Sequence, residues 1–313
     1  MVSSRLMVLA GCAALAVLPQ NAFGADYPDT LRPSYDCCQD NSVDDSLGFE
    51  FGLNYVYSGG QHRMTLSGGS TYSQDDTSHI LEGFIKIDDY STDTVFKARL
   101  GYSIANESRY ATPATGGVTT TQTGGHVAYV DTDLAYLPWG GSYGRFGGLI
   151  GYSYKNESSS MGRVSYTTAS GGDSSVNDLN IHALKIGAAG HGDYGPISVD
   201  AQASLIPYAW LTGTYGGFYQ PNFGAAPVYQ QGSAGAIDGA LYGASGEVTL
   251  GYQAMDNVKL NLGARASYLT GDANVRFTAR EVGNPGNAQD YIIKTTNLSF
   301  MRYGLFGGIS GKF

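Results

Sequence analysis

The sequence predicts an all-β protein, a closed antiparallel transmembrane β-barrel of about ten strands, with long loops at one end and short turns at the other. Three observations support this fold class. Segments that alternate between large apolar and small or polar residues recur along the chain. The connections between them are alternately long and short. The composition combines 45 Gly and 24 Tyr with only 14% charged residues, against about 25% in an ordinary soluble domain.

The first segment, residues 47–58, shows the alternation most clearly. Its apolar face holds Leu47, Phe49, Phe51, Leu53, Tyr55 and Tyr57, and its other face is small and polar, with Glu50 and Asn54. Period-two alternation of this kind predicts a strand. We expect the apolar face to meet lipid, with Leu47 and Tyr57 near the two interfaces.

Nine further segments continue the pattern. They span residues 79–88, 95–103, 127–137, 145–154, 179–189, 197–205, 240–253, 258–268 and 300–313. The two faces of 179–189 are ambiguous, which makes it the weakest segment. No stretch has the period of an amphipathic helix, and strands of about 10–12 residues suit a tilted membrane span.

The connections carry the second signal. Long ones are expected at 59–78, 106–125, 156–178, 212–237 and 270–293, and short ones at 89–94, 138–143, 190–195 and 254–257. A compact soluble domain rarely carries several structureless loops longer than about 15 residues, whereas a transmembrane barrel does so routinely. An even number of strands places both chain ends at the short-turn end. A soluble sandwich, the alternative, usually carries Lys, Glu and Thr on its polar face, where this chain often has Gly, Ser, Asn or Ala.

The start of the chain has the features of a secretion signal. Arg5 precedes an apolar stretch at Leu6–Leu18, and Ala22-Phe23-Gly24 supplies the small residues of a cleavage site. We therefore divide the chain into a signal peptide (1–24), a periplasmic N-terminal leader (25–46) and the barrel (47–313). A lipobox-like Leu9–Cys12 is the rival interpretation, but apolar residues continue well past it. The net charge of −9 argues against nucleic acid as a partner.

The last segment contains "YGLFGGISGKF" and ends on an aromatic residue. Together with the signal peptide, it resembles the Gram-negative outer-membrane β-barrel proteins, which typically end in an alternating strand with a C-terminal aromatic residue. The resemblance implies a location in the cell outer membrane, in contact with its lipid and lipopolysaccharide. It also implies an assembly signal for the barrel-assembly machinery, formed on the lipid side by Tyr303, Leu305, Ile309 and Phe313.

The polar face predicts what fills the lumen. We expect a belt of mixed charge formed by Glu50, Glu82, Arg99, Asp131, Asp133, Asp200, Glu247, Arg265 and Arg302. Arg99 should be flanked by Glu82 and by the pair Asp131/Asp133. Charges in a narrow barrel must pair or be hydrated, because burial alone is costly. The belt is expected either to plug the barrel or to line a narrow, ion-selective pore.

Enzymatic candidates are few. Strand number and chain length resemble the omptin proteases, which carry an Asp pair facing an Asp-His pair at the extracellular rim. Asp131 and Asp133 have the spacing of paired carboxylates, but they are expected in mid-barrel and the Asp-x-His partner is missing. For a lipid hydrolase, His79 next to Ser78, and His182, are the candidates.

We predict no catalytic, cofactor-binding or metal-binding residues. No His/Cys/Asp/Glu cluster has ligand spacing, and the adjacent Cys37 and Cys38 lack further ligands. Asp75-Asp76 and Asp88-Asp89 are expected as solvated loop charges. The long loops, rich in Tyr and small polar residues, favour an envelope-structural or surface-interaction role. A narrow porin-like pore is the alternative, and an outer-membrane protease or lipid hydrolase the second alternative.

Overall fold

The computed structural model describes residues 47–111, 120–123, 125–141, 143–158, 177–215, 218, 220 and 222–313. The predicted signal peptide and leader, with Cys37 and Cys38, lie outside the described residues. The described chain is built from β-strands. None of these residues belongs to a helix long and apolar enough to cross a membrane.

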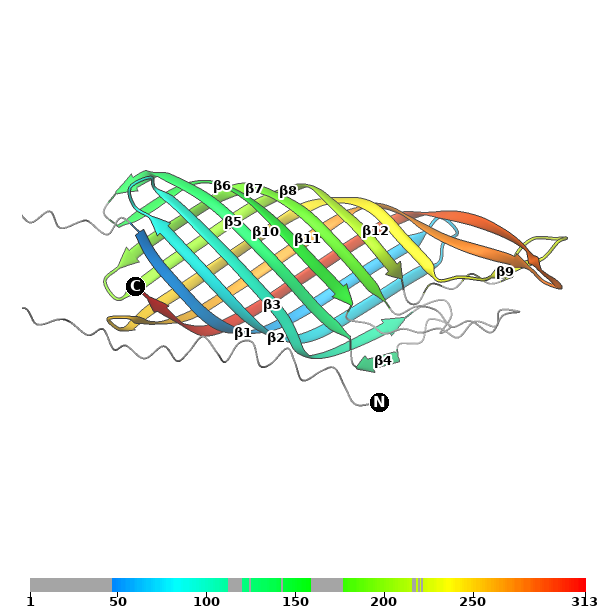
Figure 1. Cartoon of the computed structure of the whole chain (residues 1–313), viewed down its shortest axis with the longest axis horizontal. Coiled ribbons are helices and arrows are strands. Elements are labelled where there is room, and N and C mark those ends of the chain that lie inside the picture. Colours follow the sequence, from blue (N-terminus) through cyan, green and yellow to red (C-terminus); the bar gives the residue numbers. More distant parts are fainter. Residues whose placement is uncertain are drawn as a thin grey trace, which may run out of the picture. The chain divides into compact units, whose positions relative to one another are not determined.

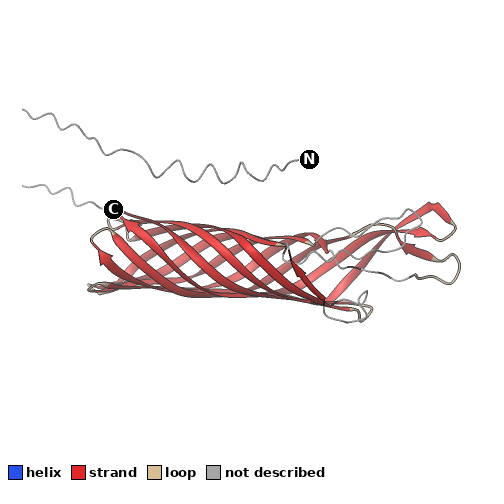
Figure 2. Ribbon diagram, turned by 90° about the horizontal axis from the view of Figure 1, so that it is seen from below, coloured by secondary structure: helices blue, strands red, loops and turns tan. Residues whose placement is uncertain are grey.

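Ten strands form a closed antiparallel ring, as predicted (Figures 1 and 2). In ring order they are β1 (Leu47–Leu66), β2 (Thr71–Asp89), β3 (Thr94–Ala111), β5 (His126–Gly141), β6 (Gly144–Ser158), β7 (Asp178–Tyr194), β8 (Ile197–Tyr215), β10 (Gly235–Met255), β11 (Val258–Glu281) and β12 (Asn284–Lys312). The pairing of β12 with β1 closes the ring. Two short strands, β4 (Thr120–Thr123) and β9 (Tyr229–Gln231), add to β3 and β11. A closed ring leaves no edge inside a membrane, so every backbone group there can be paired.

The two ends of the ring differ as the sequence predicts. Short turns follow β2, β5, β7 and β10, and the start of β1 and the end of β12 lie at this same end, where the backbones of Phe49 and Phe313 exchange two hydrogen bonds. We call it the short-turn end and the opposite end the long-loop end. Gly195 turns the chain from β7 to β8 with a φ of 64°, which glycine adopts without strain.

Two predicted long connections are wrong. Residues 59–78 and 270–293 are not loops: β1 and β2 continue to a tight turn at 67–70, and β11 and β12 continue to Val282-Gly283. β11 and β12 run past the ends of most neighbouring strands, with β9 beside them (Figure 1). The strands continue, but their apolar residues now face inward instead of outward. The alternation with apolar residues on the outer face, which is typical of a membrane strand, is therefore lost.

The outer face of the ring carries an apolar band. On β1 the six residues predicted to meet lipid all point outward, with exposed fractions of 44–57%. Ten residue steps of about 3.3 Å, tilted by about 40°, span about 25 Å, the height of the apolar band of a membrane barrel. Aromatic residues gather at both margins of the band. Those toward the short-turn end include Tyr90, Tyr136, Trp139, Tyr143, Phe146, Tyr194, Tyr252 and Phe313, and those toward the long-loop end include Tyr57, Tyr102, Tyr152, Tyr208, Trp210, Tyr242, Tyr268 and Tyr303. We call these rows the lower and upper girdles.

The interior changes character along the barrel axis. Toward the short-turn end many inward side chains are polar or charged, as on β1 with Glu50, Asn54 and Ser58, and two small apolar clusters lie among them, around Val56 and Leu149. Toward the long-loop end they form one apolar core. This cap core includes Met64, Leu66, Tyr72, Leu179, Ile181, Leu211, Tyr215, Phe218, Ile237, Val275, Phe277, Leu298 and Phe300. Its tight burial raises the pKa of the Tyr215 hydroxyl. Above the upper girdle the barrel is therefore packed inside like a soluble β-barrel.

Truncating the cap core should destabilise the protein. Phe277 is buried and packs against the rings of Phe218, Phe223 and Tyr291, with ring centroids 5.1–6.4 Å apart. Phe277→Ala should lower the free energy of unfolding by about 3–5 kcal/mol, because it removes buried surface and leaves a cavity. Urea unfolding of protein refolded into lipid vesicles measures the change. Tyr268→Ala, on the outer face, is the matched control, and an equal loss in both variants would contradict a packed cap.

Candidate functional site in the barrel lumen

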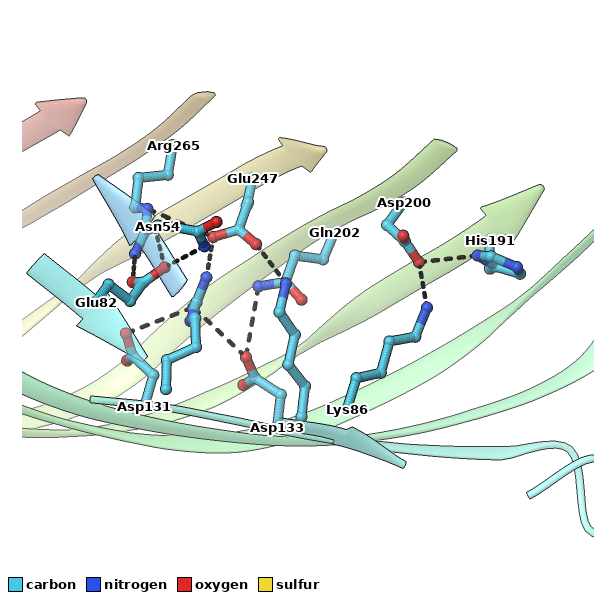
Figure 3. A network of polar contacts seen from close by, with 12 residues as sticks. Asn54, Glu82, Lys86, Asp131, Asp133, His191, Asp200, Gln202, Glu247 and Arg265 are labelled. Carbon is cyan, nitrogen blue, oxygen red and sulfur yellow. Dashed lines mark hydrogen bonds and ion pairs between the residues drawn. The ribbon is translucent and has the colours of Figure 1, made fainter. Parts of the chain in front are cut away.

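The structure places all nine residues of the predicted belt on the inner face. Glu50, Glu82, Arg99, Asp131, Asp133 and Glu247 are buried, and Asp200, Arg265 and Arg302 are partly buried. Each one makes at least one ion pair with an inward side chain from another strand. The candidate site is therefore a network of polar contacts across the lumen (Figure 3).

Arg99 lies at the centre of this network. Its guanidinium binds Glu247, and its Nη2 lies 3.4 Å from Asp131 and 3.9 Å from Asp133. The neighbouring Lys185 Nζ lies 2.6 Å from Asp133 and 3.6 Å from Asp131. The predicted contact of Arg99 with the Asp131/Asp133 pair is present, and a second cation shares that pair.

Glu82, which we expected to flank Arg99, makes its own ion pair with Arg265. It binds Arg265 through two parallel hydrogen bonds of 2.6 and 2.8 Å, and it also accepts hydrogen bonds from Tyr129 at 2.5 Å and Asn54 at 2.9 Å. Glu82 lies on β2 and Arg265 on β11, so the pair crosses the lumen (Figure 3). Long side chains in a narrow barrel reach over the axis, so partners need not lie on adjacent strands.

Below this level, toward the short-turn end, further cations pair in the same way. Lys97 Nζ lies 2.6 Å from Glu247, Lys86 Nζ lies 2.8 Å from Asp200, and Lys259 Nζ lies 3.3 Å from Glu50. At the mouth, Arg145 lies 2.7 Å from Asp88. Asp88 is thus a buried lumen partner, and the expectation that it is a solvated loop charge is wrong.

A separate cluster lies above, beneath the cap core. Arg302 binds Asp76 through hydrogen bonds of 3.0 and 3.1 Å and Glu157 through one of 2.8 Å from Nε. His62 Nε2 lies 3.7 Å from Glu157. Asp76 was also expected as a solvated loop charge, and its burial corrects that expectation. Ligand atoms of His62, Asp76 and Glu157 lie within 4.8 Å of one another, but the Arg302 guanidinium already binds both carboxylates.

The inward charges described in the membrane-level lumen balance. The acidic set is Glu50, Asp76, Glu82, Asp88, Asp131, Asp133, Glu157, Asp200 and Glu247, and the basic set is Lys86, Lys97, Arg99, Arg145, Lys155, Lys185, Lys259, Arg265 and Arg302. In the basic set, Lys155 is the member without a described carboxylate within 4.0 Å; it donates to Ser267 Oγ at 2.9 Å. A neutral, paired lumen avoids the cost of isolated buried charge.

Sequence reasoning missed Arg145, Lys155, Lys185, Glu157 and Asp76. Lys185 sits in the segment with ambiguous faces, although Leu184 and Ile186 on either side are exposed and marked it as inward. Glu157 and Asp76 fall in stretches assigned to long connections. At Lys155, Glu157 and Asp76 strand assignment depended on an apolar outer face, which ends at the upper girdle.

The space left between these side chains is small. Two cavities of about 70 Å³ each lie in the lumen, lined in common by Arg99, Gln202 and Glu247, and each has room for a few water molecules. A wider cavity of about 300 Å³ lies at the short-turn end, lined by Lys86, His191 and Lys259. At the other end, the upper cavity is bounded by Ile181, Ile206 and Leu269 of the cap core.

Both histidines named as lipid-hydrolase candidates lie on the outer face of the barrel. His79 points outward against Tyr55 and Tyr57, whereas Ser78 points inward and donates to Asp76 at 2.8 Å. His182 likewise lies on the outer face, where its ring nitrogen is 2.7 Å from the Tyr152 hydroxyl. Asp131 and Asp133 are held in ion pairs in mid-barrel.

The sequence matches no known family model and no curated protein. Its fold is similar to that of the outer membrane protease OmpT from Escherichia coli, with a TM-score of 0.53, 12% identity, and coverage of 86% of this chain and 97% of that one. The translocator domain of the autotransporter NalP from Neisseria meningitidis aligns at a TM-score of 0.35, with 14% identity over 84% of this chain and 88% of that one. At these identities the likeness to OmpT shows the barrel fold alone, and the weaker alignment adds nothing to it.

Removing one charge from the Arg99 network should be costly. Glu247→Gln leaves Lys97 and Arg99 facing a neutral side chain, and the free energy of unfolding should fall by about 3–5 kcal/mol. The control is Asp238→Asn, which breaks an exposed ion pair with Arg276 and should cost no more than about 1 kcal/mol. Urea unfolding in vesicles compares the two. Similar values would show that the lumen is well hydrated rather than buried.

Proposed function

We propose that this chain is an outer-membrane protein of a Gram-negative envelope, with the short-turn end in the periplasm and the long-loop end outside the cell. The apolar band of about 25 Å and its two aromatic girdles support a membrane-spanning barrel. The periplasmic turns of bacterial outer-membrane barrels are the short ones, which supports the orientation. The signal peptide over 1–24 and a periplasmic leader over 25–46 belong to the same proposal.

Its proposed role is structural or interactive rather than conductive. The observation that carries this role is the sealed interior: a charge-balanced network with small cavities lies beneath an apolar cap core. A barrel filled in this way serves as a rigid stem that holds its outer strands and loops above the membrane. An envelope-structural or surface-interaction role follows, and we do not expect a protease or lipid hydrolase.

The end of the chain fits the proposed assembly signal. Tyr303, Leu305, Ile309 and Phe313 are all exposed on the outer face. The ring of Phe313 stacks on that of Phe51, with centroids 5.4 Å apart. The backbone of Phe313 also exchanges two hydrogen bonds with that of Phe49. We propose that the barrel-assembly machinery recognises this face before β12 pairs with β1.

Planar-bilayer recording tests the sealed stem against the pore. The refolded protein should show no stepwise conductance, and Arg99→Ser should show none either, because the cap core stays closed above that level. A general porin refolded by the same route is the positive control. Ion-selective steps from the parent protein would contradict the proposed role and support the narrow pore.

Loss of the terminal aromatic should impair assembly in cells. Deleting Phe313 should reduce the heat-modifiable, folded species in outer-membrane fractions several-fold, whereas Leu47→Ala, a matched loss at the lower interface, should leave most of it. Gel mobility of heated and unheated membranes measures both. Equal folded fractions would contradict the assembly signal, and absence of the parent protein from the outer membrane would contradict the location.

A further inference from the structure

A groove of about 660 Å³ lies on the outer wall of the barrel, at the upper girdle and above it. It crosses β8, β10, β11 and β12. One wall is aromatic and consists of Tyr208 and Trp210, which are 52% and 54% exposed. The opposite wall is polar, with Asp272, Asn274 and Lys294. Gly239 and Ala240 on β10 lie between the walls, so small residues form the floor.

The register of the sheet fixes this arrangement. Trp210 on β8 lies opposite Ala240, and Ala240 lies opposite Asp272 on β11. In the next outward-facing row, Asn274 on β11 lies opposite Lys294 on β12. The aromatic and polar walls are thus one small residue apart across three hydrogen-bonded strands, and backbone pairing holds their separation.

Two irregularities in the sheet shape the walls. The register of β8 shifts between Ile206 and Ala209, which both face inward, so that Pro207 and Tyr208 face outward together. The register of β11 against β12 shifts between Gly271 and Asn274, where the Ala273 backbone N–H donates instead to Thr295 Oγ at 2.9 Å. Such bulges re-aim side chains and are over-represented next to functional sites.

The charged side chains of the polar wall are available to bind a ligand. The carboxylate of Asp272 and the ammonium of Lys294 are exposed, and neither has an ion pair or side-chain hydrogen bond with another described residue. Asp238, also in the groove, pairs with Arg276 at 2.8 Å. An aromatic wall facing a carboxylate, an amide and an ammonium suits a sugar ring, whose C–H face packs on the indole while its hydroxyls donate and accept.

We propose that this groove binds the sugar headgroup of a membrane glycolipid. The proposal rests on the proposed outer-membrane location and orientation. The groove opens onto the apolar band, where Leu205 and Tyr242 directly beneath it are 69% and 59% exposed. An amphiphile can therefore place its acyl chains on the band and its sugar between Trp210 and Asp272. This continuity with lipid favours a glycolipid over a free saccharide.

The tryptophan content allows a direct test. The chain has two Trp, and Trp139 lies in the lower girdle, so Trp139→Phe leaves Trp210 as the sole tryptophan emitter. This variant is refolded into phosphatidylglycerol vesicles, and its heat-modifiable mobility is checked first. It is then titrated with lipopolysaccharide, with the oligosaccharide released from that lipopolysaccharide, and with more phospholipid. We expect a saturable change in Trp210 emission with lipopolysaccharide, and binding at least about tenfold weaker with the free oligosaccharide.

Matched charge variants complete the test. In the Trp139→Phe background, Asp272→Ala and Lys294→Ala should each weaken lipopolysaccharide binding at least about tenfold, whereas Asp256→Ala and Lys312→Ala, at the short-turn end, should not. Unchanged affinity in the groove variants, or an equal response to phospholipid, would overturn the sugar site. Free oligosaccharide binding as tightly as lipopolysaccharide would overturn the glycolipid assignment. A chain that never inserts into vesicles shows no heat-modifiable mobility. That result contradicts the membrane location, and with it the glycolipid site.

Discussion

The closed hydrogen-bonded ring is the constraint on which the rest of the structure depends. Once β12 pairs with β1, every residue of the ten strands faces either the lumen or the outside, and no strand can slip by one residue without exchanging the two faces. The environment on each side then decides which residues fit. On β1, Phe51 and Tyr55 face outward at the level of the apolar band, while Met64 and Leu66 on the same strand face inward above it. The inner and outer faces of the strands continue past the upper girdle, but above it the inner face is apolar and the outer face is polar.

This exchange explains how one set of strands joins two kinds of barrel. In the lower part, apolar side chains cover the outside, and paired charges with two small apolar clusters occupy the inside. In the upper part, the inside is an apolar core such as a soluble protein would have, and polar residues such as Gln61 and Arg63 face outward. The cluster of Arg302, Asp76 and Glu157 lies at the boundary between the two interiors. The ten strands themselves supply both kinds of interior.

The outer wall shows where this regular pattern is interrupted. The shifts of register on β8 and between β11 and β12 both occur at or above the upper girdle, and the proposed glycolipid groove lies between them. Below the girdle, pairing along these strands is regular until β10 nears its short-turn end. A membrane-embedded wall has to keep its backbone groups paired, so irregular pairing is better tolerated where water reaches the sheet.

The sequence by itself determined the strands that cross the apolar band, the short turns and, except in 179–189, the inner and outer faces, because large apolar residues at every second position indicate the face that meets lipid. It also placed Glu50, Glu82, Arg99 and Glu247 on the inner face. Only the tertiary structure decided that Glu82 binds Arg265, that Lys185 shares the Asp131/Asp133 pair, and that residues 59–78 and 270–293 are strands. Ion-pair partners across the lumen depend on which strands face one another around the ring, and the sequence pattern does not show this. Strands above the apolar band bury their apolar residues inward, so they lack the periodic signal that marks a lipid-facing strand.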